Sequence, residues 1–473
     1  MAFYQNLRNF SSRFRLVLSS FMTADGLAFA NVLPEEKIQE AFDEEGNNFG
    51  EDEDAIYTPS VTLWAFLSQV LFKKEQRSCV TAVSRVVTLF VVLGKDPPSD
   101  DTGAYCRARA KLSEIVIRRL TCEVADGCER TVPRRWLWHG RHVKLVDGST
   151  VSMPDTEANQ EAYPQHGGQK EGLGFPMARI VVLLSLATAM VSDMAIGPCR
   201  GKETGETALF RELLDRLARG DIVLADRFYC SYFMVCLLME LGVDLVVRLH
   251  QRRTADFRRG RRLGKGDHVV VWTRPECPEW MDMETYLRMP KTIEVREIEV
   301  HVSQPGFRVE SMVVVTTLVD AKKYTKEDVA ELYHKRWLVE LDIRDIKSTL
   351  GMDVLRCKTP HMVHREIWTC LLAYNLIRKA IMEAARREGL SPRQISFTAA
   401  MQKIAASYKS LVEHDGAIAT NLIEIHLADL TGHRVGNRPD RVEPRAVKRR
   451  PNPIALLTKP RDEARADLLA GKA

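Results

Sequence analysis

The chain lacks the features that would place it in a membrane or outside the cell. Its longest apolar stretch, residues 180–191, contains Ser and Thr and is too short to span a bilayer, so we interpret it as buried strand material. The N-terminus shows no clear apolar segment or cleavage site of a signal peptide. The ten cysteines are scattered and include no CxxC pair, which argues against a zinc site and favours reduced thiols in a cytosol. We see no internal repeat.

The charge is nearly balanced overall but unevenly distributed. The net charge is +5, and contents of 45% hydrophobic and 28% charged residues are those of a globular protein. Residues 35–54 hold ten acids and one lysine. Residues 252–265 hold seven Lys or Arg and one acid, and residues 434–461 hold nine and two. Such basic clusters indicate local contacts with a polyanion, although a solvated loop is the simpler interpretation of any one of them.

The hydrophobic pattern changes along the chain. Apolar residues recur at helical spacing in residues 1–135, including 105–120, so this part is predicted to be mostly helical. From about residue 140 the pattern predicts strands, a hairpin at 178–195, and then alternating helices and strands, which together indicate a mixed α/β fold. Residues 250–318 are predicted to be rich in strands. A helix at 368–385 follows, and the Pro- and Arg-rich chain after about residue 433 is expected to be extended or disordered.

The segment 333–347 is the most informative part of the sequence. On one continuous helix, four polar side chains fall within about 60° of one another: Tyr333, Arg336, Glu340 and Lys347. An apolar stripe lies beside them, and three acids are expected on the solvent side: Glu331, Asp342 and Asp345. One acid between two cations suits a metal ligand that works next to phosphates. An ordinary amphipathic helix with surface ion pairs is an equally good interpretation of this helix alone.

Two aspartates extend the pattern. Asp147 and Asp226 each end an apolar strand run, and the ends of buried strands are where sites collect in α/β folds. With Glu340 they make three acids from three separate elements, a set that could hold two divalent ions for phosphodiester chemistry. Magnesium prefers such oxygen-only ligands. The alternative is that each aspartate caps a turn or a helix.

These motifs resemble a known family. VDGST with Asp147, ADRFY with Asp226, and the spacing Tyr-x2-Arg-x3-Glu-x6-Lys from 333 to 347 are similar to the three motif regions of DDE transposases of bacterial insertion sequences. The match is to the IS-four family, which includes the Tn-five transposase. The run YPQHGGQKEGLGFPMARIV at 163–181 also resembles that family, and the resemblance covers roughly residues 100–385.

The resemblance implies an α/β fold with a ribonuclease-H-like catalytic core that a β-strand insertion domain interrupts. The expected organisation is a helical N-terminal DNA-end-binding domain at 1–135, the catalytic core at 136–250 and 319–385, the β-rich insertion at 251–318, and a C-terminal helical region with a basic Pro/Arg-rich tail at 386–473. The insertion accounts for the long separation between Asp226 and Glu340.

The resemblance also implies cut-and-paste transposition. Hydrolysis at the transposon end frees a 3′-OH, which attacks the opposite strand to give a hairpin that water reopens, and the 3′-OH finally attacks target DNA. Asp147, Asp226 and Glu340 are expected to be catalytic and to hold two Mg²⁺ per active site, for which Mn²⁺ can substitute. Four residues are expected to contact DNA phosphates: Tyr333, Arg336, Lys347 and Arg344.

The insertion carries further candidates. In the family an aromatic residue of this domain stacks on a flipped base, and the candidates here are Trp272 and Trp280, either of which could instead be a core residue. Six arginines could track the DNA backbone: Arg252, Arg253, Arg258, Arg259, Arg261 and Arg262.

The implied partners are double-stranded DNA, both as terminal inverted repeats and as target, and a second copy of the chain in a homodimer on DNA. The implied location is a bacterial cytoplasm, at the nucleoid when the protein is bound to DNA, with no membrane contact. Two alternatives remain open at this point. One is a catalytically silent DNA-binding protein or transposition inhibitor derived from a transposase, and the other is a plain metal-dependent DNA nuclease.

Overall fold

The computed structural model describes residues 35–50, 52, 55–72, 74–92, 96–168, 170–301, 311–413, 424–425, 427–436 and 458–471. Most of the basic tail expected at 434–461 therefore lies outside the described residues. The chain divides into two compact units. The first comprises residues 1–143, 182–194 and 338–435, and the second comprises residues 144–181, 195–337 and 436–473.

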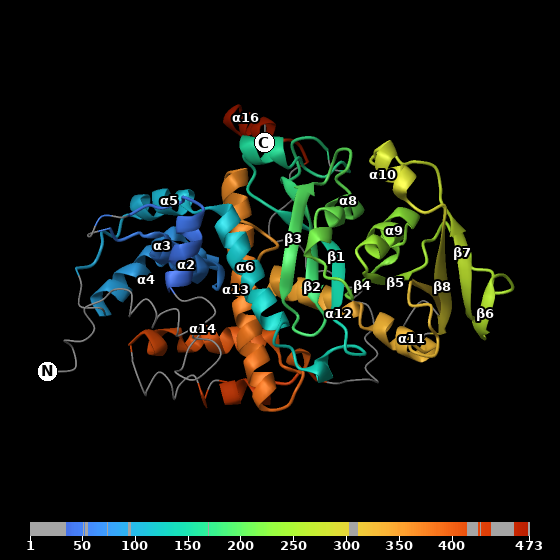
Figure 1. Cartoon of the computed structure of the whole chain (residues 1–473). Coiled ribbons are helices and arrows are strands. Elements are labelled where there is room, and N and C mark those ends of the chain that lie inside the picture. The colour runs from blue at the N-terminus through green and yellow to red at the C-terminus, as the bar shows by residue number, and fades with distance from the viewer. Residues whose placement is uncertain are drawn as a thin grey trace. The chain divides into compact units, whose positions relative to one another are not determined.

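The first unit is built mainly of helices (Figure 1). Its N-terminal part contains α2 (Glu35–Glu44), α3 (Pro59–Val70), η2 (Lys74–Arg77), α4 (Cys79–Val92), α5 (Thr102–Lys111), α6 (Glu114–Glu129) and η3 (Arg134–Trp136). Its C-terminal part contains most of α12 (Trp337–Arg344), then η6 (Asp345–Thr349), α13 (Pro360–Arg387), η7 (Pro392–Gln394) and α14 (Phe397–Glu413). Wherever the structure describes the first 135 residues, the predicted helical segments are helical, with one of them divided into two helices.

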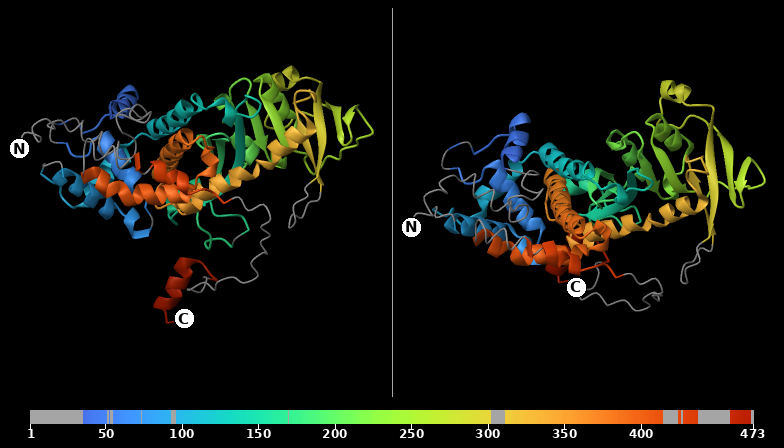
Figure 2. Two further views of the ribbon diagram at one scale, coloured as in Figure 1. Left: turned by 90° about the horizontal axis from the view of Figure 1, so that it is seen from below. Right: turned by 60° about the horizontal axis from the view of Figure 1, so that its bottom comes forward.

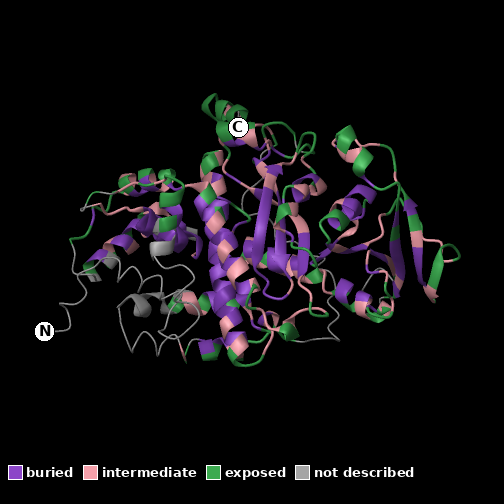
Figure 3. Cartoon of the chain, in the orientation of Figure 1, coloured by how far each residue is buried: buried purple, intermediate pink, exposed green. Residues whose placement is uncertain are grey.

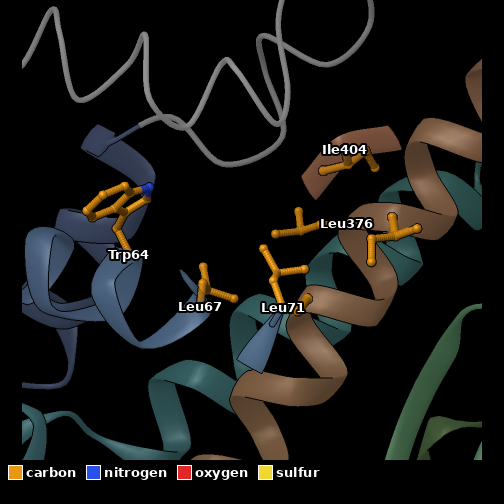
Figure 4. Close-up of a pocket in the computed structure, with 7 residues that line it drawn as sticks. Trp64, Leu67, Leu71, Leu376 and Ile404 are labelled. Carbon is orange, nitrogen blue, oxygen red and sulfur yellow. The ribbon is translucent and has the colours of Figure 1, made fainter. Parts of the chain in front are cut away.

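The long helix α13 is the centre of this unit. It packs against α3, α6 and α14, and it is buried along most of its length (Figure 3). A small apolar cavity of about 20 Å³ lies beside it, lined by Trp64, Leu67, Leu71, Ala373, Leu376, Ile377 and Ile404 (Figure 4). The packing of apolar side chains from helices far apart in the sequence thus forms the core of the first unit.

A cap breaks one of the predicted helical segments. The pattern favoured continuous helix through 105–120, but α5 ends at Lys111 and α6 begins at Glu114. The hydroxyl of Ser113 accepts a hydrogen bond from the backbone N–H of Val116, at 3.4 Å, and so caps the N-terminus of α6. Leu112 just before it has an extended ψ of 129°, which ends α5.

A sheet of nine strands makes up much of the second unit, although parts of β2 and β3 belong to the first unit. The spatial order of the nine strands is β3-β2-β1-β4-β5-β9-β8-β7-β6. The strands are β1 (Val143–Ser152), β2 (Met177–Ser185), β3 (Val191–Pro198), β4 (Ile222–Ala225), β5 (Asp244–Arg248), β6 (Arg261–Gly264), β7 (Asp267–Thr273), β8 (Thr292–His301) and β9 (Ser311–Thr316). The connecting elements are α7 (Glu157–Ala162), α8 (Glu206–Arg211), η4 (Leu214–Arg216), η5 (Arg227–Tyr229), α9 (Tyr232–Glu240), α10 (Met283–Arg288) and α11 (Lys326–His334), and α16 (Arg461–Leu469) is close to the C-terminus.

The β-rich segment extends this sheet instead of forming a separate one. β4 and β5 are parallel, whereas β5 pairs with β9 antiparallel, and β9, β8, β7 and β6 continue antiparallel to the edge. Figure 2 shows this edge from two directions, with β6 to β8 in yellow-green and yellow. The strands predicted in residues 250–318 are thus confirmed, and they are hydrogen-bonded to the strands that precede them in the chain.

The predicted apolar hairpin is also confirmed. β2 and β3 span it, and the side chains from Ile180 to Leu184 are all buried. The interpretation of this stretch as buried strand material is therefore correct. None of the helices that the structure describes combines the length and apolarity needed to cross a bilayer.

Candidate active site

Asp147 and Asp226 lie on neighbouring strands of the second unit. β1 and β4 are adjacent in the sheet, Asp147 is within β1, and Asp226 follows the last residue of β4 directly. Asp147 follows the buried apolar run of residues 143–146 as predicted, and β1 itself continues past it to Ser152. Asp226 does follow its strand as expected.

Local hydrogen bonds fix both carboxylates. One oxygen of Asp147 accepts a hydrogen bond from the backbone N–H of Gly148, at 2.9 Å. One oxygen of Asp226 accepts from the N–H of Phe228, at 2.7 Å, and so caps the short helix η5. The capping role considered for Asp226 is therefore real.

The pKa of Asp147 is shifted by burial and by other acids, Asp226 and Glu206. Burial raises the pKa of Asp147 to about 6. The Gly148 hydrogen bond and the charge of Arg336 oppose this rise in pKa, whereas the charges of Asp226 and Glu206 add to it. We call Asp147, Glu206 and Asp226 the acid cluster. Negative charges that repel one another in a partly buried place favour the binding of a cation.

Glu206 was not found by sequence reasoning. It is the first residue of α8, and its pKa is raised by burial and then by Asp226, with Arg179 acting in the opposite direction. Its sequence context gives no motif that separates it from other acids at the start of a helix.

Two residues of the 333–347 signature lie beside the acid cluster. Nη1 of Arg336 is 3.9 Å from Oδ2 of Asp147, and both side chains are less than one fifth exposed. Tyr333 is buried, and burial raises its pKa to about 12, although Arg336 and Arg248 act to lower it. A neutral phenol and a guanidinium therefore accompany the acids, and both can donate hydrogen bonds to phosphate oxygens.

The signature does not occupy one continuous helix, as the sequence pattern predicted. α11 ends at His334, α12 begins at Trp337, and η6 at Asp345–Thr349 is a π-helical turn. Tyr333 is therefore on α11, Arg336 in the turn and Glu340 in the first turn of α12, whereas Lys347 is in η6. The backbone N–H groups of Lys335 and Arg336 bond to carbonyls three residues earlier, which tightens the chain and breaks the regular 3.6-residue period.

The expected solvent side of this helix was also wrong. Asp342 is only 2% exposed and is paired with Arg378 and Arg393, and Asp345 is paired with Arg378. Only Glu331 is exposed as predicted, in a surface pair with Lys335. The sequence period could not show this, because the arginines come from α13 and η7, far along the chain.

The other candidates occupy varied environments. Glu340 and Lys347 are partly exposed and Arg344 is exposed, and these three belong to the first unit. Burial lowers the pKa of Lys347, while Asp353 acts to raise it. The six arginines of the 252–262 segment are all exposed, and Arg258 pairs with Asp256 at 2.8 Å.

The two tryptophans differ. Trp272 is 4% exposed, donates a hydrogen bond from Nε1 to Glu297 at 3.2 Å, and has Arg253 over its ring at 4.0 Å. Trp280 is half-buried, with Arg211 over its ring at 3.9 Å. A base could reach Trp272 only if its surroundings opened.

The donor chemistry of the acid cluster suits a hard divalent cation. All its ligand atoms are carboxylate oxygens, the type that Mg²⁺ and Mn²⁺ prefer. Within the part of the chain that the structure describes, no three His, Cys, Asp or Glu side chains are close enough together to hold one ion. The binding of a cation would therefore have to bring the carboxylates of the acid cluster closer to one another.

Comparisons with known proteins identify the class. The family described as "Transposase DDE domain" matches residues 138–376, slightly more than half of the chain. The chain is 26% identical over 398 residues to "Transposase InsG for insertion sequence element IS4" of Escherichia coli (strain K12), covering 82% of this chain and 85% of that protein. It is 38% identical over 268 residues to "Transposase for insertion sequence element IS421" of Escherichia coli, covering 50% of this chain and 65% of that protein.

One solved structure is more distant. The "Cryo-EM structure of piggyBac transposase synaptic complex with hairpin DNA (SNHP)" superimposes with a TM-score of 0.43 and 11% identity, over 93% of this chain and 89% of that chain. This likeness is too weak to define the fold.

The chain therefore belongs to the DDE transposase family, whose members cleave DNA and transfer strands. Within that family it is a transposase of the IS4 group of insertion sequences. The resemblance drawn from the three motifs is confirmed, and neither a silent DNA-binding protein nor a plain nuclease is needed to explain the sequence.

Proposed function

We propose that this transposase moves its element by cut and paste, with Asp147, Asp226 and Glu340 as the catalytic acids. The proposal is carried by two observations. Asp147 lies on β1 and Asp226 directly follows β4, the neighbouring strand, and Nη1 of Arg336 is 3.9 Å from Oδ2 of Asp147. The strand order β3-β2-β1-β4-β5, with β4 and β5 parallel, supports a ribonuclease-H-like core around these two acids.

Chain connectivity supports Glu340 as the third acid. It follows Arg336 by four residues, which span at most about 14 Å even when extended. Arg336 is beside Asp147, so the backbone of Glu340 is limited to the neighbourhood of the acid cluster whatever the placement of the two units. A carboxylate on the first turn of α12 can then complete the set.

These acids would hold two divalent cations, Mg²⁺ or Mn²⁺, which supply the Lewis acidity for in-line displacement at phosphorus. The residues of the chain itself position the DNA. Arg336 can bind a phosphate through two parallel hydrogen bonds, and the Tyr333 phenol, which stays protonated because its pKa is raised to about 12, can donate a third. Lys347 and Arg344 would add positive charge for phosphates further along the strand.

The exposed arginines of residues 252–262 would follow the DNA backbone, and their contribution would weaken with added salt. Of the two tryptophans, Trp280 is better placed to stack on a flipped base, because Trp272 is held by Glu297 and Arg253. Two active sites are needed to cut two element ends, so we propose a homodimer on DNA. The natural location is the bacterial cytoplasm, at the nucleoid when DNA is bound.

The test of cut and paste is the product set formed from end-labelled DNA that carries the element's own terminus, with Mg²⁺ present. The expected products are a released hairpin end, visible as a double-length strand on a denaturing gel, and later joined target DNA. Nicked ends that join to target while still attached to flanking DNA would contradict the cut-and-paste proposal.

A further inference from the structure

The carboxyl group of Glu206 lies against the backbone next to Asp147. A β-carbon placed on Gly148 would be 2.3 Å from Cδ of Glu206 and 2.4 Å from its Oε1. Atoms of this kind do not approach so closely, so a side chain at position 148 would displace the flexible carboxyl end of Glu206. Gly148 does not have a positive φ, so the effect of a larger residue here would come from this contact and not from backbone strain.

Glu206 is held in this position by its own loop. Nη1 of Arg179, on β2, donates a hydrogen bond to the carbonyl of Thr204 at 2.6 Å, two residues before Glu206. This bond ties the start of α8 to the sheet that carries Asp147. The approach of Glu206 to Gly148 is thus supported by a backbone anchor.

A second, independent feature points to the same place. Tyr229 has no exposed surface, and its hydroxyl has no hydrogen-bond partner among the described residues. Burial raises the pKa of Tyr229, and the charges of Glu206, Asp147 and Asp226 raise it further. Tyr229 belongs to η5, which follows Asp226 directly and contacts α8, and its ring packs edge-on against Phe210 of α8, with centroids 5.5 Å apart. The hydroxyl is therefore a buried donor held between the elements that carry Asp226 and Glu206.

We propose that Glu206 is a fourth carboxylate of the catalytic site, which binds the divalent cation directly or through one of its waters, and that Tyr229 is a positioning residue that donates a hydrogen bond to it when the cation is bound. This inference rests on the proposed role of Asp147 and Asp226. A buried hydroxyl without a partner lowers stability, and the movement of a carboxylate or a hydrated cation toward it removes that cost.

Substitutions can separate the contribution of the Glu206 charge to metal binding from the contribution of its packing. Glu206→Gln keeps the shape and removes the charge, whereas Glu206→Asp keeps the charge on a shorter side chain. Gly148→Ala leaves Glu206 in the sequence but forces its flexible carboxyl end away from Asp147. If the cation binds Glu206, the Gln and Ala variants weaken metal binding, and Asp retains more of it.

The experiment is a titration of the full-length protein with Mn²⁺, with bound ion measured by electron paramagnetic resonance in the absence of DNA. We expect Glu206→Gln and Gly148→Ala to weaken Mn²⁺ binding about tenfold, and their double variant to be no weaker than either alone. Circular dichroism of each variant verifies folding, and Gly148→Ala carries the test if Glu206→Gln does not fold.

Asp226→Asn is the reference that separates this inference from the proposed function. Loss of Mn²⁺ binding in Asp226→Asn with unchanged binding in Glu206→Gln would overturn the role of Glu206 and leave the proposed site intact. Unchanged binding in Asp226→Asn would overturn the proposed site itself, and the role of Glu206 within it.

Tyr229→Phe tests the donor. The Mg²⁺ concentration that gives half-maximal cleavage of element-end DNA should rise several-fold, while the rate at saturating Mg²⁺ changes little. An unchanged Mg²⁺ requirement would show that the hydroxyl does not position the carboxylate.

Discussion

Asp342 should be essential for the stability of the first unit, although the sequence pattern placed it in solvent. Its carboxylate is 2% exposed and accepts hydrogen bonds from Arg378 at 3.1 Å and from both terminal nitrogens of Arg393 at 3.1 and 2.9 Å. Asp342→Asn keeps the shape but removes the charge, and the new amide group directs N–H donors at guanidinium donors.

The expected loss of stability depends on the partners that Arg378 and Arg393 keep in Asp342→Asn. Arg378 is 4% exposed and would keep Asp345, at 3.2 Å, as an ion-pair partner, together with the neutral hydroxyl of Tyr374 at 2.8 Å. Arg393 would keep the carbonyls of Ser185 and Leu186. Removing one partner of a buried ion pair costs about 3–5 kcal/mol, because the other charge is left uncompensated. This is a large part of the total stability of about 5–15 kcal/mol of a typical folded protein.

The assay is urea unfolding of the full-length chain, followed by circular dichroism. Glu331→Gln is the matched control, because its carboxylate makes an ion pair of 2.9 Å with Lys335 but is 70% exposed. An exposed pair should contribute less than about 1 kcal/mol. If Asp342→Asn lowers the free energy of unfolding no more than Glu331→Gln does, the buried network does not stabilise the fold as argued.

Three further outcomes are expected. Gly260→Ala should lower the stability of the β6–β7 hairpin by about 1–3 kcal/mol, because Gly260 has φ +75° and a β-carbon would be 2.2 Å from the carbonyl oxygen of Val269. The measurement is backbone hydrogen exchange, which should become faster in β6 and β7. Exchange as slow as in wild type would contradict the strain expected at Gly260. Burial would raise the pKa of Glu114, but the hydrogen bond and charge of His364 hold it below its ordinary value of 4.5. A carboxyl group whose pKa is lower in the folded state than in the unfolded state stabilises the fold at pH values above its unfolded pKa. Glu114→Gln should therefore be less stable than wild type near neutral pH, and this difference should disappear as the pH falls below 4.5. Unfolding curves measured at a series of pH values would check it. Chelation of divalent ions should abolish DNA cleavage while gel-shift binding of element ends persists, and cleavage that survives chelation would contradict a metal-dependent site.

The part of the fold that could be predicted from sequence is the part that local pattern determines. The apolar hairpin of β2 and β3 was predicted because its residues are continuously apolar, and the strand that ends before Asp226 was predicted for the same reason. Helix ends depend on single side chains, and the break between α5 and α6 depends on the hydroxyl of Ser113. The extension of the sheet by β9 could not be predicted, because strand order depends on pairing between distant segments.

The candidate site shows the same division. The three acidic motifs could be recognised from residue types and spacing, but the break in the helix that carries Arg336 and Glu340 could not, because the hydrophobic period continues across it. The neighbourhood of Glu206 is visible only in three dimensions. Nothing in the sequence links Glu206 to Gly148, and the contact exists because α8 starts beside β1.

The most direct test of the account is cleavage of element-end DNA by Asp226→Asn in Mg²⁺, with end binding measured on the same samples. Asp226 follows β4 directly, beside the strand that carries Asp147, and Asp215→Asn serves as a control because Asp215 is exposed on η4 of the same unit. The account predicts that Asp226→Asn binds ends like wild type but neither cleaves nor joins DNA, while Asp215→Asn does both. Cleavage by Asp226→Asn at the rate of Asp215→Asn would contradict the assignment of the catalytic site.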